Sequence, residues 1–124
     1  MAVTVETLKA ELKDYNFEVL TDGDISVAAR AIEKAIVWTK AKILAAKGVY
    51  RDNDLIVEQI VTKRALYELY SYAENEAVAQ DKKEDAMELL RSVYGSAVDG
   101  AGYSSGSSGQ SVLPAAAFVK PEDS

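Results

Sequence analysis

The chain has 124 residues, of which 48% are hydrophobic, and a formal net charge of -6. It contains neither His nor Cys, which excludes a Ser-His-Asp triad, a thiolate nucleophile and the usual zinc site with nitrogen and sulfur ligands. The acidic balance argues against a general nucleic-acid-binding surface, because phosphate contacts need an excess of Lys and Arg. We therefore expect no enzyme activity and no cofactor or metal ion.

Membrane and secreted proteins are also disfavoured. Residues 1–6 lack the basic start and apolar centre of a signal peptide, and no apolar run approaches the length of a membrane span. The absence of Cys removes a disulfide framework, which fits an intracellular protein. The composition divides the chain into one small domain, residues 1–95, and a tail rich in Gly and Ser, residues 96–124.

The first expected helix covers residues 5–13, and Thr4 supplies its N-cap. Residues 15–20 break the helical period, which predicts an irregular apolar segment packed on the core. The Thr-Asp-Gly-Asp sequence of residues 21–24 is typical of a turn.

Two long helices should follow. The first covers residues 26–48, with Gly48 as a left-handed stop. Its inner stripe is expected to comprise Ile25, Ala28 or Ala29, Ile32, Ile36, Thr39 and Ile43. The second covers residues 54–79 and takes its N-cap from residues 52–54. Its apolar face is expected to comprise Ile56, Val57, Ile60, Val61, Ala65, Leu66, Leu69, Tyr72 and Ala73.

A fourth helix should restart near Asp81 and end at Gly95. The basic pairs Lys63-Arg64 and Lys82-Lys83 are expected on solvated helix faces. No strand pattern precedes the tail. The predicted fold class is therefore all-α: a small helical bundle of about four helices, two of them long, followed by a flexible C-terminal tail rich in Gly and Ser.

The tail combines a flexible tether with an apolar end. Residues 100–109 are almost all Gly and Ser, and such a segment buries too little apolar surface to offset its ordering entropy. Residues 112–119 then form an apolar segment that predicts docking on a partner. The candidate docking residues are Val112, Leu113, Phe118 and Val119.

Four acidic or hydroxyl residues stand at positions 1, 3, 5 and 12 of a calcium-binding loop: Asp22, Asp24, Ser26 and Glu33. Position 6 of that loop requires Gly and is Val27 here, and position 9 is the cation Arg30. A turn followed by a helix N-terminus accounts for these residues better than a calcium site does.

Aromatic residues are frequent in this chain, with seven Tyr and one Trp. Tyr and Trp favour positions that are half buried and half wet, so these residues mark either the margin of the core or a subunit interface, with ligand stacking as a third possibility. The candidate oligomer interface comprises Trp38, Tyr50, Tyr67 and Tyr70.

Five segments occur in an order that resembles a known family. They are Thr-Val-Glu-Thr-Leu-Lys (4–9), Val-Leu-Thr-Asp (19–22), Ala-Arg-Ala-Ile-Glu-Lys-Ala-Ile (29–36), Val-Thr-Lys-Arg-Ala-Leu-Tyr-Glu-Leu-Tyr (61–70) and Glu-Asp-Ala-Met-Glu-Leu-Leu-Arg (84–91). Together they resemble the head–tail adaptor (connector, or neck) proteins of tailed bacteriophages, most closely the Mu-like prophage branch. The resemblance covers about residues 3–95 and includes no catalytic signature.

The resemblance implies a structural virion protein. Such adaptors form a homo-oligomeric ring, expected here to be a dodecamer, between the portal protein and the tail or stopper protein. The ring extends a channel through which DNA only passes, and the tail after the last helix reaches back to the portal. The protein would lie in the host cytoplasm during assembly and then at the head–tail junction of the virion. The loop at residues 48–54 lacks the Pro common in relatives, and it is expected to contact a neighbouring subunit.

Two other functions stay open. The chain could be a small helical protein-binding module or regulator whose tail docks on a partner, or a minor enzyme that uses a carboxylate or a Lys. A ring predicts a concentration-dependent mass, a regulator predicts a monomer or dimer, and an enzyme predicts a deep polar pocket.

Overall fold

The computed structural model describes residues 3–99, and this part of the chain is all-α. Five α-helices follow one another: α1 (Val5–Glu11), α2 (Asp14–Thr21), α3 (Ile25–Ala45), α4 (Leu55–Tyr72) and α5 (Glu76–Tyr94). A single 3-10 turn, η1 (Ser96–Val98), ends the described chain, and no strand forms within it. The predicted fold class is confirmed. The expectations for residues 96–124 can be followed only to Asp99, because the remainder lies outside the described residues.

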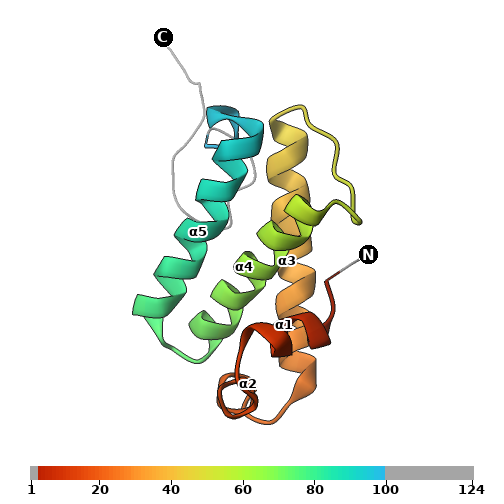
Figure 1. Ribbon diagram of the computed structural model, residues 1–124. Helices are drawn as coiled ribbons and strands as arrows, with labels where there is room; N and C mark the ends of the chain where they lie inside the picture. The colour runs from red at the N-terminus through yellow and green to blue at the C-terminus, as the bar shows by residue number, and fades with distance from the viewer. Residues whose placement is uncertain (1–2, 100–124) are drawn as a thin grey trace.

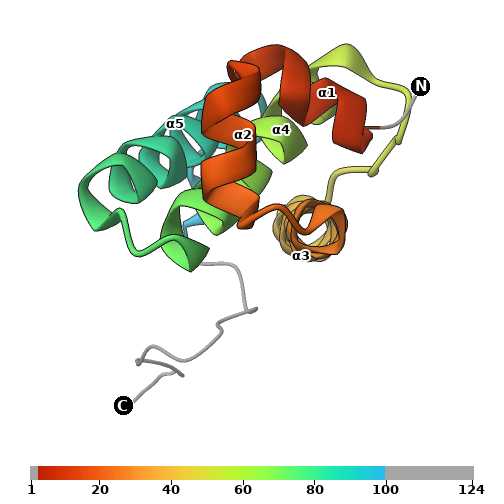
Figure 2. The ribbon, with the colours of Figure 1, turned by 90° about the horizontal axis from the view of Figure 1, so that it is seen from below.

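Helix α4 lies at the centre of the bundle and packs most extensively against α3 and α5. Viewed along α3, the helices α3 and α5 lie on opposite flanks of α4 (Figure 2). The two short helices α1 and α2 close the lower end of the bundle in Figure 1. The core is formed by apolar residues of all five helices, and its largest fully buried side chains include Leu8, Ile43, Ile60, Leu69 and Leu90.

Helix ends follow the local chemistry of the sequence. The Thr4 side chain accepts a hydrogen bond from the Thr7 amide in a reciprocal cap, as predicted. Asp54 caps α4 by accepting from the amides of Ile56 and Val57. Gly95 adopts a positive φ of 81° and ends α5, also as predicted. Short polar side chains thus satisfy amides that have no partner within their helices.

Two predicted boundaries are wrong. Residues 15–20 lie within helix α2 and are not irregular, because the helix buries Phe17 and Leu20 in the core. The long helix expected at residues 54–79 ends at Tyr72, where Glu74 adopts a φ of 63° and reverses the chain. Asn75 then caps α5 by accepting from the amide of Val78, so α5 begins earlier than predicted.

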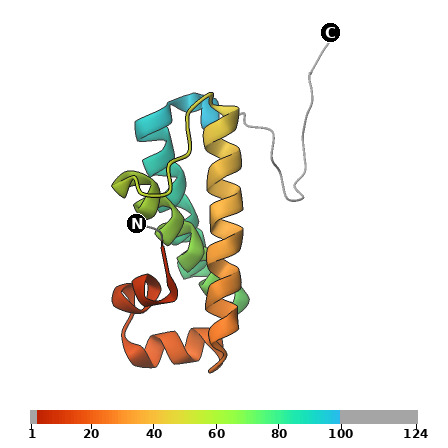
Figure 3. The same ribbon diagram turned by 90° about the vertical axis from the view of Figure 1, so that its right-hand side faces the viewer.

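The left-handed stop after α3 is also placed differently. Lys47 has a φ of 66°, whereas Gly48 has no positive φ. The small size of Gly48 matters for another reason: it lies in van der Waals contact with the ring of Tyr94 at the end of α5. Gly48 therefore allows the loop after α3 to approach α5 closely (Figure 3).

Several apolar residues expected in the core are exposed. They are Ile25, Ile56, Tyr72 and Ala73, whereas Ala28, one of the two alternatives given for α3, is fully buried. Conversely, Val27, Ala31, Ala35 and Trp38 complete the buried face of α3. The inner stripe of α3 is thus rotated toward small residues, which lets α4 approach closely.

Candidate functional site

Two of the four candidate aromatic residues, Trp38 and Tyr67, are positioned by the packing of α3 on α4. Trp38 lies on the buried face of α3, and Tyr67 follows Arg64 by about one turn of α4. The Cζ atom of Arg64 lies 4.3 Å from the ring centroid of Trp38 and 4.3 Å from that of Tyr67. The guanidinium is therefore stacked between two aromatic rings, an arrangement that its planar, weakly hydrated cation favours.

The burial of Arg64 contradicts the prediction made from the sequence. The Lys63-Arg64 pair was expected on a solvated face, but Arg64 is only 8% exposed. Its Nε atom lies 3.7 Å from Oε2 of Glu68, one turn further along α4. Arg64 occupies the apolar stripe of α4, one turn after Ile60 and Val61. That spacing was the signal that could have identified it.

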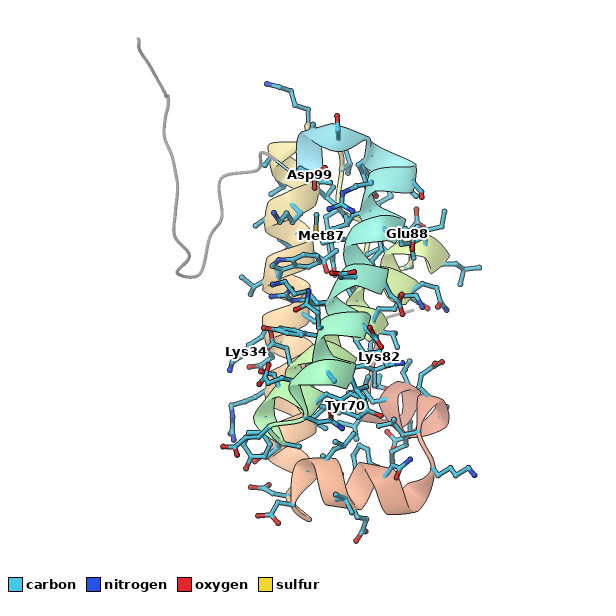
Figure 4. All side chains as sticks on the ribbon, turned by 90° about the vertical axis from the view of Figure 1, so that its left-hand side faces the viewer. Lys34, Tyr70, Lys82, Met87, Glu88 and Asp99 are labelled. Carbon is cyan, nitrogen blue, oxygen red and sulfur yellow. The ribbon has the colours of Figure 1, made fainter. Side chains whose placement is uncertain are left out.

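A groove opens beside this stack, between α3 and α4. It has a volume of about 500 Å³ and is lined by Glu33, Lys34, Val37, Trp38, Arg64, Tyr67 and Glu68. Lys34 projects from α3 in Figure 4. The groove thus combines two aromatic rings with charges of both signs, a composition typical of the margin of a protein–protein interface.

The other two candidate aromatics lie apart from the stack. Tyr70 is half-buried against the core near the end of α4 (Figure 4). Tyr50 lies in the loop after α3, where its hydroxyl donates a hydrogen bond of 3.1 Å to Oδ1 of Asp52. Lys40 lies over its ring at 5.3 Å. Burial, with the Asp52 hydrogen bond and charge, raises the pKa of Tyr50 to about 12.

Exposed apolar residues stand at both ends of that loop. Val49 is 62% exposed, Leu55 is 75% exposed, and Ile56 follows directly. We call Val49, Leu55 and Ile56 the loop patch. The contact between Gly48 and Tyr94 holds the start of the loop against α5, and the loop runs from the upper end of α3 to the start of α4 in Figure 1. The loop and the start of α4 therefore present three aliphatic side chains to the surface.

The last described residues are held by three contacts. Val98 is fully buried, so core packing continues past the expected domain boundary at Gly95. Lys42 Nζ donates a hydrogen bond of 3.1 Å to the carbonyl oxygen of Val98, and Arg91 Nε donates bonds of 2.8 and 3.0 Å to the carboxylate of Asp99. Burial lowers the pKa of the Lys42 ammonium, although the Asp99 carboxylate opposes this effect. These contacts hold η1 and Asp99 against α3 and α5.

The docking residues predicted in the tail lie outside the described residues. Their role stays a prediction for all four: Val112, Leu113, Phe118 and Val119.

The residues of the possible calcium loop form a helix cap instead. Asp24 caps α3 by accepting hydrogen bonds from the Ser26 amide and hydroxyl, and the Ser26 hydroxyl is the main reason that the pKa of Asp24 is lowered. Within residues 3–99, no group of three acidic side chains is placed to hold a metal ion. No helix in this range is long and apolar enough to cross a membrane.

Comparisons with known proteins add no relatives. The chain matches no protein-family model, no curated protein and no solved structure.

Proposed function

We propose that this protein is a head–tail adaptor of a tailed bacteriophage virion, a structural protein that forms a ring between the portal and the tail or stopper protein. The proposal rests on the family resemblance of residues 3–95 and on one structural observation, the loop patch. In such adaptors the loop between the two long helices is expected to contact a neighbouring subunit, and here that loop presents exposed apolar side chains.

The loop patch supports the proposal through its position and its chemistry. Val49 lies in the loop, Leu55 and Ile56 lie in the first turn of α4, and all three are open to a neighbouring protein. Burial of an aliphatic side chain contributes about 1.5–3 kcal/mol in transfer terms. A neighbouring subunit that covers these side chains would gain a contribution of this size from each.

The charge of the chain fits a channel protein. A net charge of -6 repels the phosphate backbone, so duplex DNA would pass an acidic ring with little retention. Residues 112–119 would complete the assembly by docking on the portal, with Leu113 and Phe118 as the main apolar contacts.

Association of the purified chain tests the ring directly. The mass measured by light scattering should rise with concentration toward a closed oligomer, and electron micrographs of that species should show rings. Changing Val49 and Leu55 to Ser should shift the protein to the monomer without loss of helix. The matched control is Asp52→Ser with Asn53→Ser, which changes the same loop without removing apolar surface.

Attachment to the portal tests the tail. Leu113→Ser with Phe118→Ser should weaken capture by a portal protein about 100-fold or more, because two apolar anchors are removed. Ser111→Ala with Lys120→Ser serves as the control within the same segment. A monomer at every concentration that also fails to bind a portal would refute the adaptor and favour the alternative, a small helical binding module whose tail docks on another partner.

A further inference from the structure

The outer face of α3 is basic and partly apolar. Its exposed residues recur every three or four positions, so they form one stripe opposite the core. Arg30, Lys34 and Lys40 supply positive charge along it, and Glu33 is the one exposed carboxylate among them. Val37 and Leu44, two helical turns apart, are 56% and 57% exposed. We call this stripe the α3 face; it ends beside the loop patch.

The outer face of α5 has the opposite charge. Exposed carboxylates of Asp81, Glu84, Asp85 and Glu88 dominate it, with Lys83 among them. A shallow hollow of about 540 Å³ runs along this helix and is lined by Gln80, Lys83, Glu84, Met87, Glu88 and Arg91. Figure 4 shows Met87 and Glu88 on this side of the molecule. We call this surface the α5 face; the half-buried Met87 gives it an apolar floor.

The two faces cannot meet within one copy. Helices α3 and α5 lie on opposite flanks of α4, and α4 packs between them (Figure 2). Two complementary surfaces on opposite flanks of one subunit produce head-to-tail association, in which each copy uses one face for each neighbour. Repetition of such a contact closes into a ring when the rotation between subunits divides a full turn.

We propose that the α3 face of one copy docks on the α5 face of a second copy. This inference rests on the proposed ring and names the two surfaces that form it. Arg30 and Lys34 face the carboxylates of the neighbour, while Val37 and Leu44 cover the hollow around Met87. The spacing agrees. Val37 and Leu44 lie seven positions apart, a rise of about 10 Å, and the hollow runs from Gln80 to Arg91, eleven positions and a rise of about 16 Å.

A charge-swap experiment on the full chain tests this contact. In the first variant, Arg30→Glu and Lys34→Glu give the α3 face the same sign as the α5 face. In the second, Glu84→Lys and Glu88→Lys give the α5 face the same sign as the α3 face. Each variant alone should need at least about tenfold more protein to assemble, as measured by light scattering at low salt. Circular dichroism and thermal melting verify that both remain folded.

Mixing the two variants is the decisive step. Every contact in an alternating ring then joins either the two reversed faces or the two unchanged faces. Both pairs have opposite signs, so the mixture should assemble as the wild-type protein does. A two-fold contact between identical α3 faces or identical α5 faces would instead leave one of the two single variants unimpaired. The control is Lys9→Glu with Lys13→Glu, on the α1–α2 side. It makes the same change in net charge as the first variant and should assemble normally.

The outcomes separate the two proposals. If the wild-type protein forms rings that neither variant disturbs, or if mixing does not restore assembly, the α3–α5 contact is wrong and the adaptor function stands. If the wild-type protein neither assembles nor binds a portal, both are wrong. Val37→Ser with Leu44→Ser gives an independent check: it should weaken assembly at high salt, where the charged variants differ least.

Discussion

The backbone of Gly48 lies directly against the ring of Tyr94. A Cβ atom at Gly48 would lie 2.9 Å from Cε1 and 3.0 Å from Cδ1 of Tyr94, and 3.1 Å from Cγ2 of Ile43. These separations are shorter than ordinary van der Waals contacts. The loop after α3 can therefore meet the end of α5 only because residue 48 has no side chain.

This contact predicts that Gly48→Ala lowers the free energy of unfolding by about 1–3 kcal/mol, the usual cost of overpacking. The same change in a Tyr94→Leu background should cost clearly less, since the ring edge that blocks the methyl group is gone. Urea unfolding of the four proteins in this cycle measures the difference. An equal cost in both backgrounds would show that the ring is not the cause.

We expect the substitution Lys47→Gly to stabilise the protein. The φ of 66° at Lys47 places an L side chain in the left-handed region, which costs about 1–2 kcal/mol and which Gly adopts freely. Because Gly loses more backbone entropy on folding, the net gain from Lys47→Gly should be at most about 1 kcal/mol. Arg30→Gly, in the exposed middle of α3, should instead destabilise by about 1 kcal/mol. Thermal melting of both variants tests the opposite signs.

The turn after α5 predicts where the chain can be shortened. A protein that ends at Asp99 should keep the stability of the full chain, because the described core is complete at Val98. A protein that ends at Gly95 should lose about 2 kcal/mol, since Val98 is fully buried and Asp99 binds Arg91. Equal melting temperatures for the two truncated proteins would mean that η1 contributes nothing to the fold.

The stacked guanidinium predicts that Lys is a poor substitute for Arg64. Arg64→Lys keeps a buried charge but loses the planar contact with both rings, so it should destabilise by about 1–2 kcal/mol. Arg64→Met fills the same space without a charge and should cost less. Trp38 is the only Trp in the chain, so its fluorescence should report both unfolding and the altered stack. A more stable Lys variant than Met variant would contradict this account.

We expect the folded protein to lose stability in strong alkali because of Tyr50. Its pKa is raised to about 12 from an ordinary 10, so the folded state holds a proton that the unfolded state releases. The resulting stabilisation is complete below about pH 10 and is lost as the pH rises toward about 12. Spectrophotometric titration of the wild-type protein and of Tyr50→Phe isolates this group. Asp52→Asn should lower the pKa, because it removes the adjacent negative charge.

The sequence by itself determined the features that depend on local hydrogen bonds and backbone freedom. Thr4, Asp54 and Gly95 act as predicted because a cap is formed by residues within one turn of the helix end. The all-α class followed in the same way from helical spacing of apolar residues. Asn75 carried a similar signal for the start of α5, but the unbroken apolar period around it favoured a longer helix.

Only the tertiary structure decided the features that depend on contacts between distant segments. An isolated helix as short as α2 is unstable in water, so its formation depends on burying Phe17 and Leu20 against the bundle. Arg64 is buried because α3 brings Trp38 to one side of its guanidinium while Tyr67 covers the other. Gly48 is needed because α5 returns Tyr94 to the loop, 46 residues later in the chain. Local sequence encodes none of these distances, because each is set by how whole helices pack.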